Sequence, residues 1–170
     1  MVAVLAVLLG VALVAGVKGC GKKLPDMIPM VPAAVHAQHV QLDASYLPAR
    51  LVALHWAERQ AGCWYSWGGS NCAEGFDCSG LVMAAYARAG IWLPHNTVAM
   101  LYSGHLRWEP RSQARWGDLT MWGGSFPFHV ELFFGYDGLR TFGAHEAGTR
   151  VGVAWNGGWW YDAESFYRVV

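Results

Sequence analysis

The sequence contains little charge. Only 14% of its 170 residues are charged, and 12 Lys and Arg balance 12 Asp and Glu, so the formal net charge is zero. A chain without an excess of either sign has no general field that attracts nucleic acid or an acidic membrane surface. We therefore expect no nucleic-acid partner, and the function must be sought in local motifs.

The chain also lacks internal repeats and low-complexity tracts. Its hydrophobic content of 54% excludes disorder of the whole chain, and its length fits one domain plus an appendage. Ten Trp, seven Tyr and seven Phe are many for this length and suggest a contact groove.

The first 20 residues are apolar. Met1 to Val17 contain no charged side chain, and a helix of this length reaches about 25 Å, close to the minimum that spans a bilayer. The charges of Lys18, Lys22 and Lys23 follow the run, whereas a secretory signal carries its positive charges before it. We expect residues 1–20 to form a helix that anchors the chain in a membrane or in a larger protein assembly, with its orientation left open.

The remaining chain divides into a linker and one domain. Residues 21–45 contain Pro25, Pro29 and Pro32 without a helical or strand period, which is typical of a linker. The domain is expected over residues 46–170.

Helices are expected first within this domain. The pattern predicts one helix from Pro48 that ends before Gly62, a second over residues 78–90, and a short third one closed by Gly104. The Gly-rich segment 63–76 between the first two is expected to be a loop.

Strands are expected after the helices. The runs GDLTMW, FHVELFFG, LRTFGAH, RVGVAW and SFYRVV are rich in β-branched and aromatic residues and are separated by Gly, Asp and Pro. Helices followed by strands indicate an α+β fold with a mostly antiparallel sheet of five to six strands.

Cys78 lies where the second helix is expected to begin, within the sequence GFDCSGLV. A thiol attacks as the thiolate, and a free Cys is only about 3% ionised at pH 7. The helix dipole lowers a thiol pKa by at most about 1.5 units, so a second group is needed. An imidazolium within hydrogen-bond reach supplies the rest, which makes Cys78 a candidate nucleophile paired with a histidine.

His129, in the strand FHVELFFG, is the expected base. A third polar group must hold the imidazole in the useful tautomer. Thr141, Gly143 and His145 share one face of the next expected strand, and His145 is the candidate for that role. Backbone N–H groups at the helix start, including that of Cys78, are expected to stabilise an oxyanion.

The cysteines allow two further interpretations. A zinc site from Cys72, Cys78, His129 and His145 is conceivable, but there is no close Cys-x-x-Cys pair and a helix start suits a nucleophile better, so we expect no metal and no cofactor. Cys63 and Cys72 bracket the loop WYSWGGSN and are either a disulfide or two free thiols.

Five ordered motifs resemble the NlpC family of papain-like cell-wall cysteine peptidases: YSWGG at 65–69, FDCSGLV at 76–82, GIWLP at 90–94, GDL at 117–119 and HVELFFG at 129–135. The resemblance covers about residues 48–170. It implies a papain-like fold and hydrolysis of peptidoglycan stem-peptide bonds, commonly between D-glutamate and a diamino acid, through a cysteine thioester. It also implies that Tyr65 hydrogen-bonds near the nucleophile, and Trp67 and Ser79 are further candidates for substrate binding or oxyanion support.

The third polar residue departs from the family pattern. In the family it usually precedes an Ala, but the residue before Ala144 is Gly143, so the role is carried to His145, two places later on the same strand face. Glu131 stands where the family often has Gly. If His145 points away, a water or Glu131 is the alternative partner of His129.

Other activities and roles remain open on the same fold. An amidase, a transpeptidase or an acyltransferase keeps the nucleophile and changes the acceptor. A cell-wall-binding component of a phage tail or another envelope-penetrating assembly would need no catalysis. The expected location is the extracytoplasmic cell envelope, with a membrane tether, or a phage particle.

Overall fold

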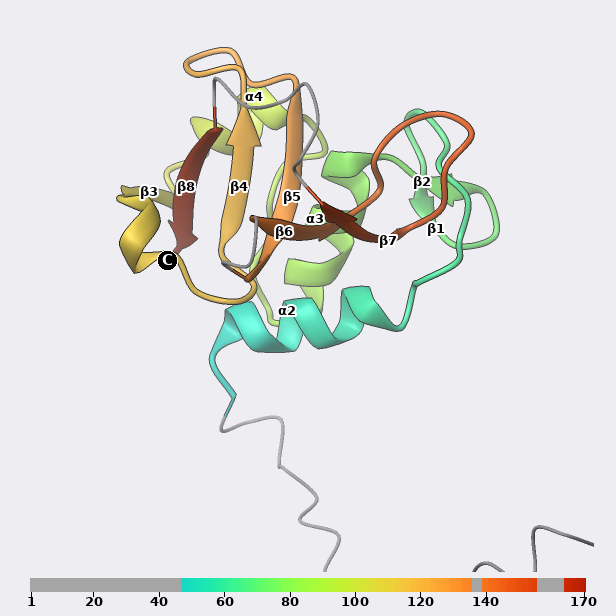
Figure 1. Ribbon diagram of the computed structural model, residues 1–170, viewed down its shortest axis with the longest axis horizontal. Helices are drawn as coiled ribbons and strands as arrows, with labels where there is room; N and C mark the ends of the chain where they lie inside the picture. Colours follow the sequence, from blue (N-terminus) through green and yellow to red (C-terminus); the bar gives the residue numbers. More distant parts are fainter. Residues whose placement is uncertain (1–46, 136–138, 156–163) are drawn as a thin grey trace, which may run out of the picture. The chain divides into compact units, whose positions relative to one another are not determined.

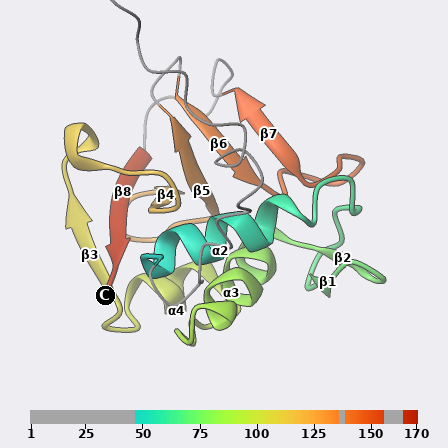
Figure 2. The same ribbon diagram turned by 90° about the horizontal axis from the view of Figure 1, so that it is seen from below.

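Helices α2 and α3 lie on one face of a six-stranded sheet (Figures 1 and 2). The computed structural model describes residues 47–135, 139–155 and 164–170, so the expected anchor 1–20 and linker 21–45 lie outside the described residues. Within these three ranges, no helix has the length and apolar character needed to cross a membrane.

The sheet is antiparallel throughout the described strands. Its order is β3-β8-β4-β5-β6-β7, and each strand pairs in antiparallel register with its neighbours. The bounds are β3 Leu106–Glu109, β4 Leu119–Trp122, β5 His129–Gly135, β6 Arg140–Gly143, β7 Gly152–Trp155 and β8 Glu164–Val169. The α+β fold predicted from the sequence is thereby confirmed.

Strand β3 was not predicted. Its sequence LRWE is short and carries two charged side chains, so its pattern is weak. It pairs only with β8 at the edge of the sheet, where Leu106 lies opposite Val169 and Glu109 opposite Phe166. Tertiary pairing with β8 stabilises this strand, and a local pattern does not report such pairing.

The three expected helices are present but shorter than predicted. They are α2 Ala49–Glu58, α3 Cys78–Arg88 and α4 Thr97–Leu101. Helix α2 begins after Pro48, which occupies the N-cap position, and buries Ala53, Leu54 and Ala57. Helix α3 packs against both α2 and β5, the strand that begins with His129.

The segment predicted as a loop contains a small hairpin. Strands β1 (Ser70–Asn71) and β2 (Gly75–Phe76) have two residues each and pair in antiparallel register. Tyr65 adds an isolated bridge to Phe76. Strands this short have no detectable period, but they fix the segment directly before the start of α3.

Candidate active site

Cys78 is the first residue of α3, and Asp77 caps that helix. The Asp77 side chain accepts hydrogen bonds from the Gly80 amide through Oδ1 at 2.7 Å and from the Gly68 amide through Oδ2 at 2.8 Å. Such a cap satisfies helix donors that would otherwise lack partners. Cys78 is 7% exposed, so the thiol is held at the positive end of the helix dipole with limited access to water.

Gly80 allows the loop to pass close to the helix start. A Cβ atom at Gly80 would lie 2.1 Å from the carbonyl oxygen of Gly69 and 2.8 Å from Nε2 of His95. The same Gly69 carbonyl accepts a hydrogen bond of 3.0 Å from the Asp77 amide. The glycine in the FDCSG motif therefore serves the close approach that places Cys78.

His129 is the first residue of β5 and lies with its ring centroid 5.4 Å from that of Trp122 on β4. Burial lowers the pKa of His129, but hydrogen bonds to Cys78 and Glu131 and the negative charge of both partners outweigh this effect and raise the pKa to about 10. The imidazolium is thus stabilised beside the sulfur. The structure brings together the two residues that the sequence proposes as nucleophile and base.

Glu131 accepts hydrogen bonds from three side chains. His129 Nε2 lies 2.9 Å from Glu131 Oε1, His145 Nδ1 bonds the same oxygen, and the Thr141 hydroxyl donates to Oε2. Glu131 is only 2% exposed. Burial raises the pKa of Glu131, but these donors and the charges of the two histidines lower it well below its ordinary value, so the carboxylate is ionised.

His145 lies just after the end of β6 and is partly buried. The sequence proposes it as the group that orients His129, with Glu131 as an alternative. In the structure His145 contacts the carboxylate of Glu131, which itself contacts His129. A sequence signal that favours Glu131 is its i, i+2 spacing from His129, which places both on one strand face.

Cys78 lines a cleft of about 290 Å³. The lining is aromatic at two points and polar elsewhere, and it comprises Trp67, Gly68, Asp77, Cys78, Ser79, His95, Asn96, Thr97 and Phe128. The Trp67 side chain is 86% exposed and therefore free to contact a bound molecule. His95, which the sequence did not single out as a site residue, lies in this cleft with Nε2 2.9 Å from Asp77 Oδ1.

Tyr65 and Ser79 flank the nucleophile. Burial, followed by the negative charges of Cys78 and Asp77, raises the pKa of Tyr65, so its phenol stays protonated and is able to donate a hydrogen bond. The Ser79 hydroxyl donates to Asp77 Oδ1 at 3.1 Å. Ser79 thereby helps to hold the helix cap in addition to lining the cleft.

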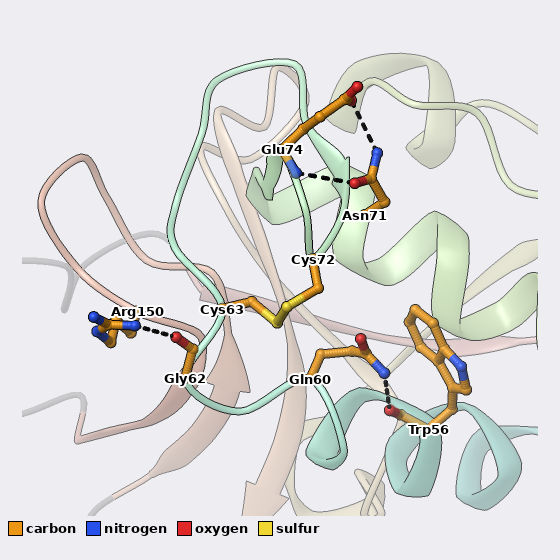
Figure 3. The surroundings of a disulfide bond; sticks show 8 residues. All are labelled: Trp56, Gln60, Gly62, Cys63, Asn71, Cys72, Glu74 and Arg150. Carbon is orange, nitrogen blue, oxygen red and sulfur yellow. Dashed lines mark hydrogen bonds between the residues drawn. A yellow bond between two sulfur atoms is a disulfide. The ribbon is translucent and has the colours of Figure 1, made fainter.

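A disulfide joins Cys63 and Cys72, with their Cα atoms 5.2 Å apart (Figure 3). It closes the loop that carries Tyr65 and Trp67 into the site. Next to it, the Arg150 guanidinium donates to the Gly62 carbonyl at 2.6 Å. Because its sulfur is bonded, Cys72 is not available as a zinc ligand, and within the described part of the chain no group of three ligating side chains is arranged to hold a metal.

The helix-borne cysteine, the strand-borne histidine and the antiparallel sheet define a papain-like α+β domain. The chain belongs to the NlpC/P60 family, whose sequence model matches residues 62–161. This family match contains Cys78, His129, Glu131 and His145.

Two curated relatives illustrate the similarity. The chain is 36% identical over 109 residues to the bifunctional muramidase/DL-endopeptidase CwlT of Bacillus subtilis, covering 62% of this chain and 32% of CwlT. It is 37% identical over 107 residues to the peptidoglycan endopeptidase RipA of Mycobacterium tuberculosis, covering 56% of this chain and 22% of RipA. The chain therefore spans a third or less of the length of these relatives.

Solved structures share the fold. The structure of Rv1477, titled a hypothetical invasion protein of Mycobacterium tuberculosis, superposes with a TM-score of 0.60 at 33% identity, covering 72% of this chain and 61% of that chain. RipD of the same organism, described as a non-catalytic NlpC/p60 domain protein adapted to peptidoglycan binding, has a TM-score of 0.57 at 28% identity, covering 74% and 98%. The family thus includes at least one protein described as non-catalytic, so activity must be argued from the site.

Proposed function

We propose that this protein is a peptidoglycan hydrolase that cleaves amide bonds of stem peptides with Cys78 as nucleophile and His129 as base. The observation that carries the proposal is the position of Cys78 at a capped helix start beside an imidazole that is stabilised as its cation. A binding module has no need of a buried cation next to a thiol. The relatives named as endopeptidases supply the substrate class.

The reaction follows from the arrangement of these two side chains. The thiolate of Cys78 attacks the carbonyl carbon of the scissile amide, and a C–S bond forms as the carbonyl π electrons move to oxygen. The imidazolium of His129 then protonates the leaving amine as the C–N bond breaks, which leaves a thioester. Neutral His129 next removes a proton from water, the water oxygen attacks the thioester, and the thiolate returns.

The helix start is suited to hold the tetrahedral oxyanion. The amide of Gly80 is bonded to the Asp77 side chain, and the amide of Leu81 makes the first helical bond, to the Asp77 carbonyl at 3.0 Å. The amides of Cys78 and Ser79 precede that first bond, at the end of a helix where donors lack intrahelical partners. Their N–H groups are the proposed oxyanion donors.

The scissile bond is proposed to join D-glutamate to a diamino acid. Support comes from the relative CwlT, whose name includes DL-endopeptidase activity. The cleft beside Cys78 offers the exposed ring of Trp67 and the hydroxyl and amide groups of Ser79 and Asn96 for contacts along a peptide.

The test is digestion of purified peptidoglycan by the full chain. New amine ends are labelled with fluorodinitrobenzene, and the released fragments are analysed by mass spectrometry. Wild-type protein is expected to release peptides with a new diamino-acid amine, and Cys78→Ala is expected to release none while it keeps the wild-type circular dichroism spectrum. Activity in Cys78→Ala would refute the mechanism, and new ester or amide products with an added nucleophile would favour a transferase.

A second candidate is a wall-binding role without catalysis, which the similarity to RipD favours. It predicts that wild type and Cys78→Ala sediment equally with peptidoglycan and that neither yields new amine ends.

For residues 1–20 we propose a tether to a membrane or to a larger assembly, supported by the absence of charged side chains in residues 1–17. That role predicts that removal of residues 1–20 abolishes co-sedimentation with vesicles or with the assembly.

A further inference from the structure

We propose that Glu131 is the positioning residue of His129 and that Gly143 is the position across the sheet that gives the Glu131 carboxylate its room. The carboxylate could therefore come from either strand. In the exchange Glu131→Gly with Gly143→Glu, a carboxylate from β6 would take the place beside His129 that the Glu131 carboxylate now occupies. This inference deepens the proposed function, because it concerns the residue that orients the base.

The strand register brings the two positions opposite each other. Strands β5 and β6 pair in antiparallel register with Leu132 opposite Phe142 and Phe133 opposite Thr141. Continuing that register by one residue places Glu131 opposite Gly143. Directly opposed residues in an antiparallel pair project from the same face of the sheet, with Cβ atoms about 5 Å apart.

Gly143 has space only for its hydrogen atom. A Cβ atom at Gly143 would lie 2.6 Å from Cγ, 2.7 Å from Cδ and 2.8 Å from Oε1 of Glu131. Both positions therefore compete for one volume, and any side chain at 143 displaces the carboxylate. The backbone itself imposes no glycine, because Gly143 is not among the residues with a positive φ.

The contacts of Glu131 define which ring nitrogen of His129 faces the cysteine. With Nε2 donating to Oε1 at 2.9 Å, Nδ1 is the ring atom left to contact Cys78. Thr141 on β6 and His145, just after the end of β6, donate to the same carboxylate. Together the three donors hold the carboxylate in one orientation, so His145 acts on His129 through Glu131.

The test compares the full chain with Glu131→Gln, Glu131→Gly, Gly143→Glu, the exchange Glu131→Gly with Gly143→Glu, and the control Glu58→Gln on α2. Steady-state hydrolysis and the alkylation of Cys78 by iodoacetamide are measured for each. Alkylation is quantified by mass spectrometry on the peptide that contains Cys78. It needs no peptidoglycan, so it remains informative even if the proposed substrate is wrong.

Glu131→Gly and Gly143→Glu are each expected to lower kcat/KM at least about 100-fold, as when a triad carboxylate is removed. The exchange is expected to recover at least about tenfold over either single variant, because it restores one carboxylate in one volume. Glu131→Gln keeps the shape but loses the charge, so the alkaline limb of its pH profile should move to lower pH. A residue that only packs would lower the whole profile without that movement.

Glu58→Gln is expected to match the wild type in every assay. The proposal is overturned if Glu131→Gln keeps the wild-type alkaline limb and alkylation rate. It is also overturned if the exchange unfolds at the wild-type temperature but is no more active than the single variants. If the exchange variant does not fold, the alkaline limb and the alkylation rate of Glu131→Gln decide whether the proposal stands.

Discussion

Asp77 joins three parts of the site: its Oδ1 atom lies 2.7 Å from the Gly80 amide and 2.9 Å from Nε2 of His95, and its Oδ2 atom lies 2.8 Å from the Gly68 amide. One carboxylate thus ties the helix that carries Cys78 to the loop and to the wall of the cleft. Its removal has consequences for stability as well as for activity.

Replacement of Asp77 by Ala is expected to lower the free energy of unfolding by about 1–2 kcal/mol, because the cap of α3 is lost. Urea denaturation followed by circular dichroism measures this change. The turn residue Glu74, which hydrogen-bonds Asn71 on the exposed surface, provides the comparison, and Glu74→Ala should change stability by less than about 0.5 kcal/mol. Equal losses for the two variants would contradict the capping role.

Removal of the disulfide by Cys63→Ser with Cys72→Ser is expected to lower the free energy of unfolding by about 2–3 kcal/mol, since the closed loop is short. The Michaelis constant should rise more than kcat falls, because Trp67 and Tyr65 lie in that loop. Thermal unfolding with and without a phosphine reductant checks the assignment. Reductant should destabilise the wild type to the level of the variant and leave the variant unchanged, and a wild type insensitive to reductant would exclude the bond.

Glu109 makes stability depend on pH in the direction opposite to that of an acid whose pKa falls on folding, although Nη2 of Arg168 lies 2.9 Å from its Oε2 atom. Burial, and then hydrogen bonding and repulsion with Asp118, raise the pKa of Glu109 above its ordinary value, against the lowering effect of Arg168. The folded state therefore binds this proton more tightly than the unfolded chain does. The stabilisation is complete below the unfolded pKa and is lost as pH rises through the raised folded pKa.

Glu109→Gln cannot ionise and should escape that loss. Relative to the wild type, its free energy of unfolding is expected to increase between pH 4 and pH 7, as measured by urea denaturation at both values. Glu58→Gln, at the partly exposed end of α2, should show no such change. A difference between Glu109→Gln and wild type that stays constant across the two pH values would show that folding does not raise the pKa of Glu109.

The sequence was sufficient for the residues whose roles follow from local patterns. Cys78 stands before a helical period, and His129 begins a run of β-branched and aromatic residues, so the sequence alone places each on the correct element. The strands that were predicted have strong local signals. Strand β3 has none, because it exists through its pairing with β8.

The arrangement around His129 could be predicted only in part. Period-two alternation indicated that Thr141 and His145 face the site, but alternation does not give distances across strands. That Glu131 fills the volume opposite Gly143 depends on the β5–β6 register, which is a tertiary property. Sequence reasoning therefore placed Glu131 second to His145, although the carboxylate is the group in contact with both histidines.

The central claim is that the imidazolium of His129 stabilises a thiolate at Cys78. The most direct measurement is the rate of Cys78 alkylation by iodoacetamide at pH 6 in wild type and in His129→Ala, quantified on the Cys78 peptide. The account predicts that the rate falls at least about tenfold in His129→Ala, because the stabilising charge is gone. Equal rates in two folded proteins would contradict it.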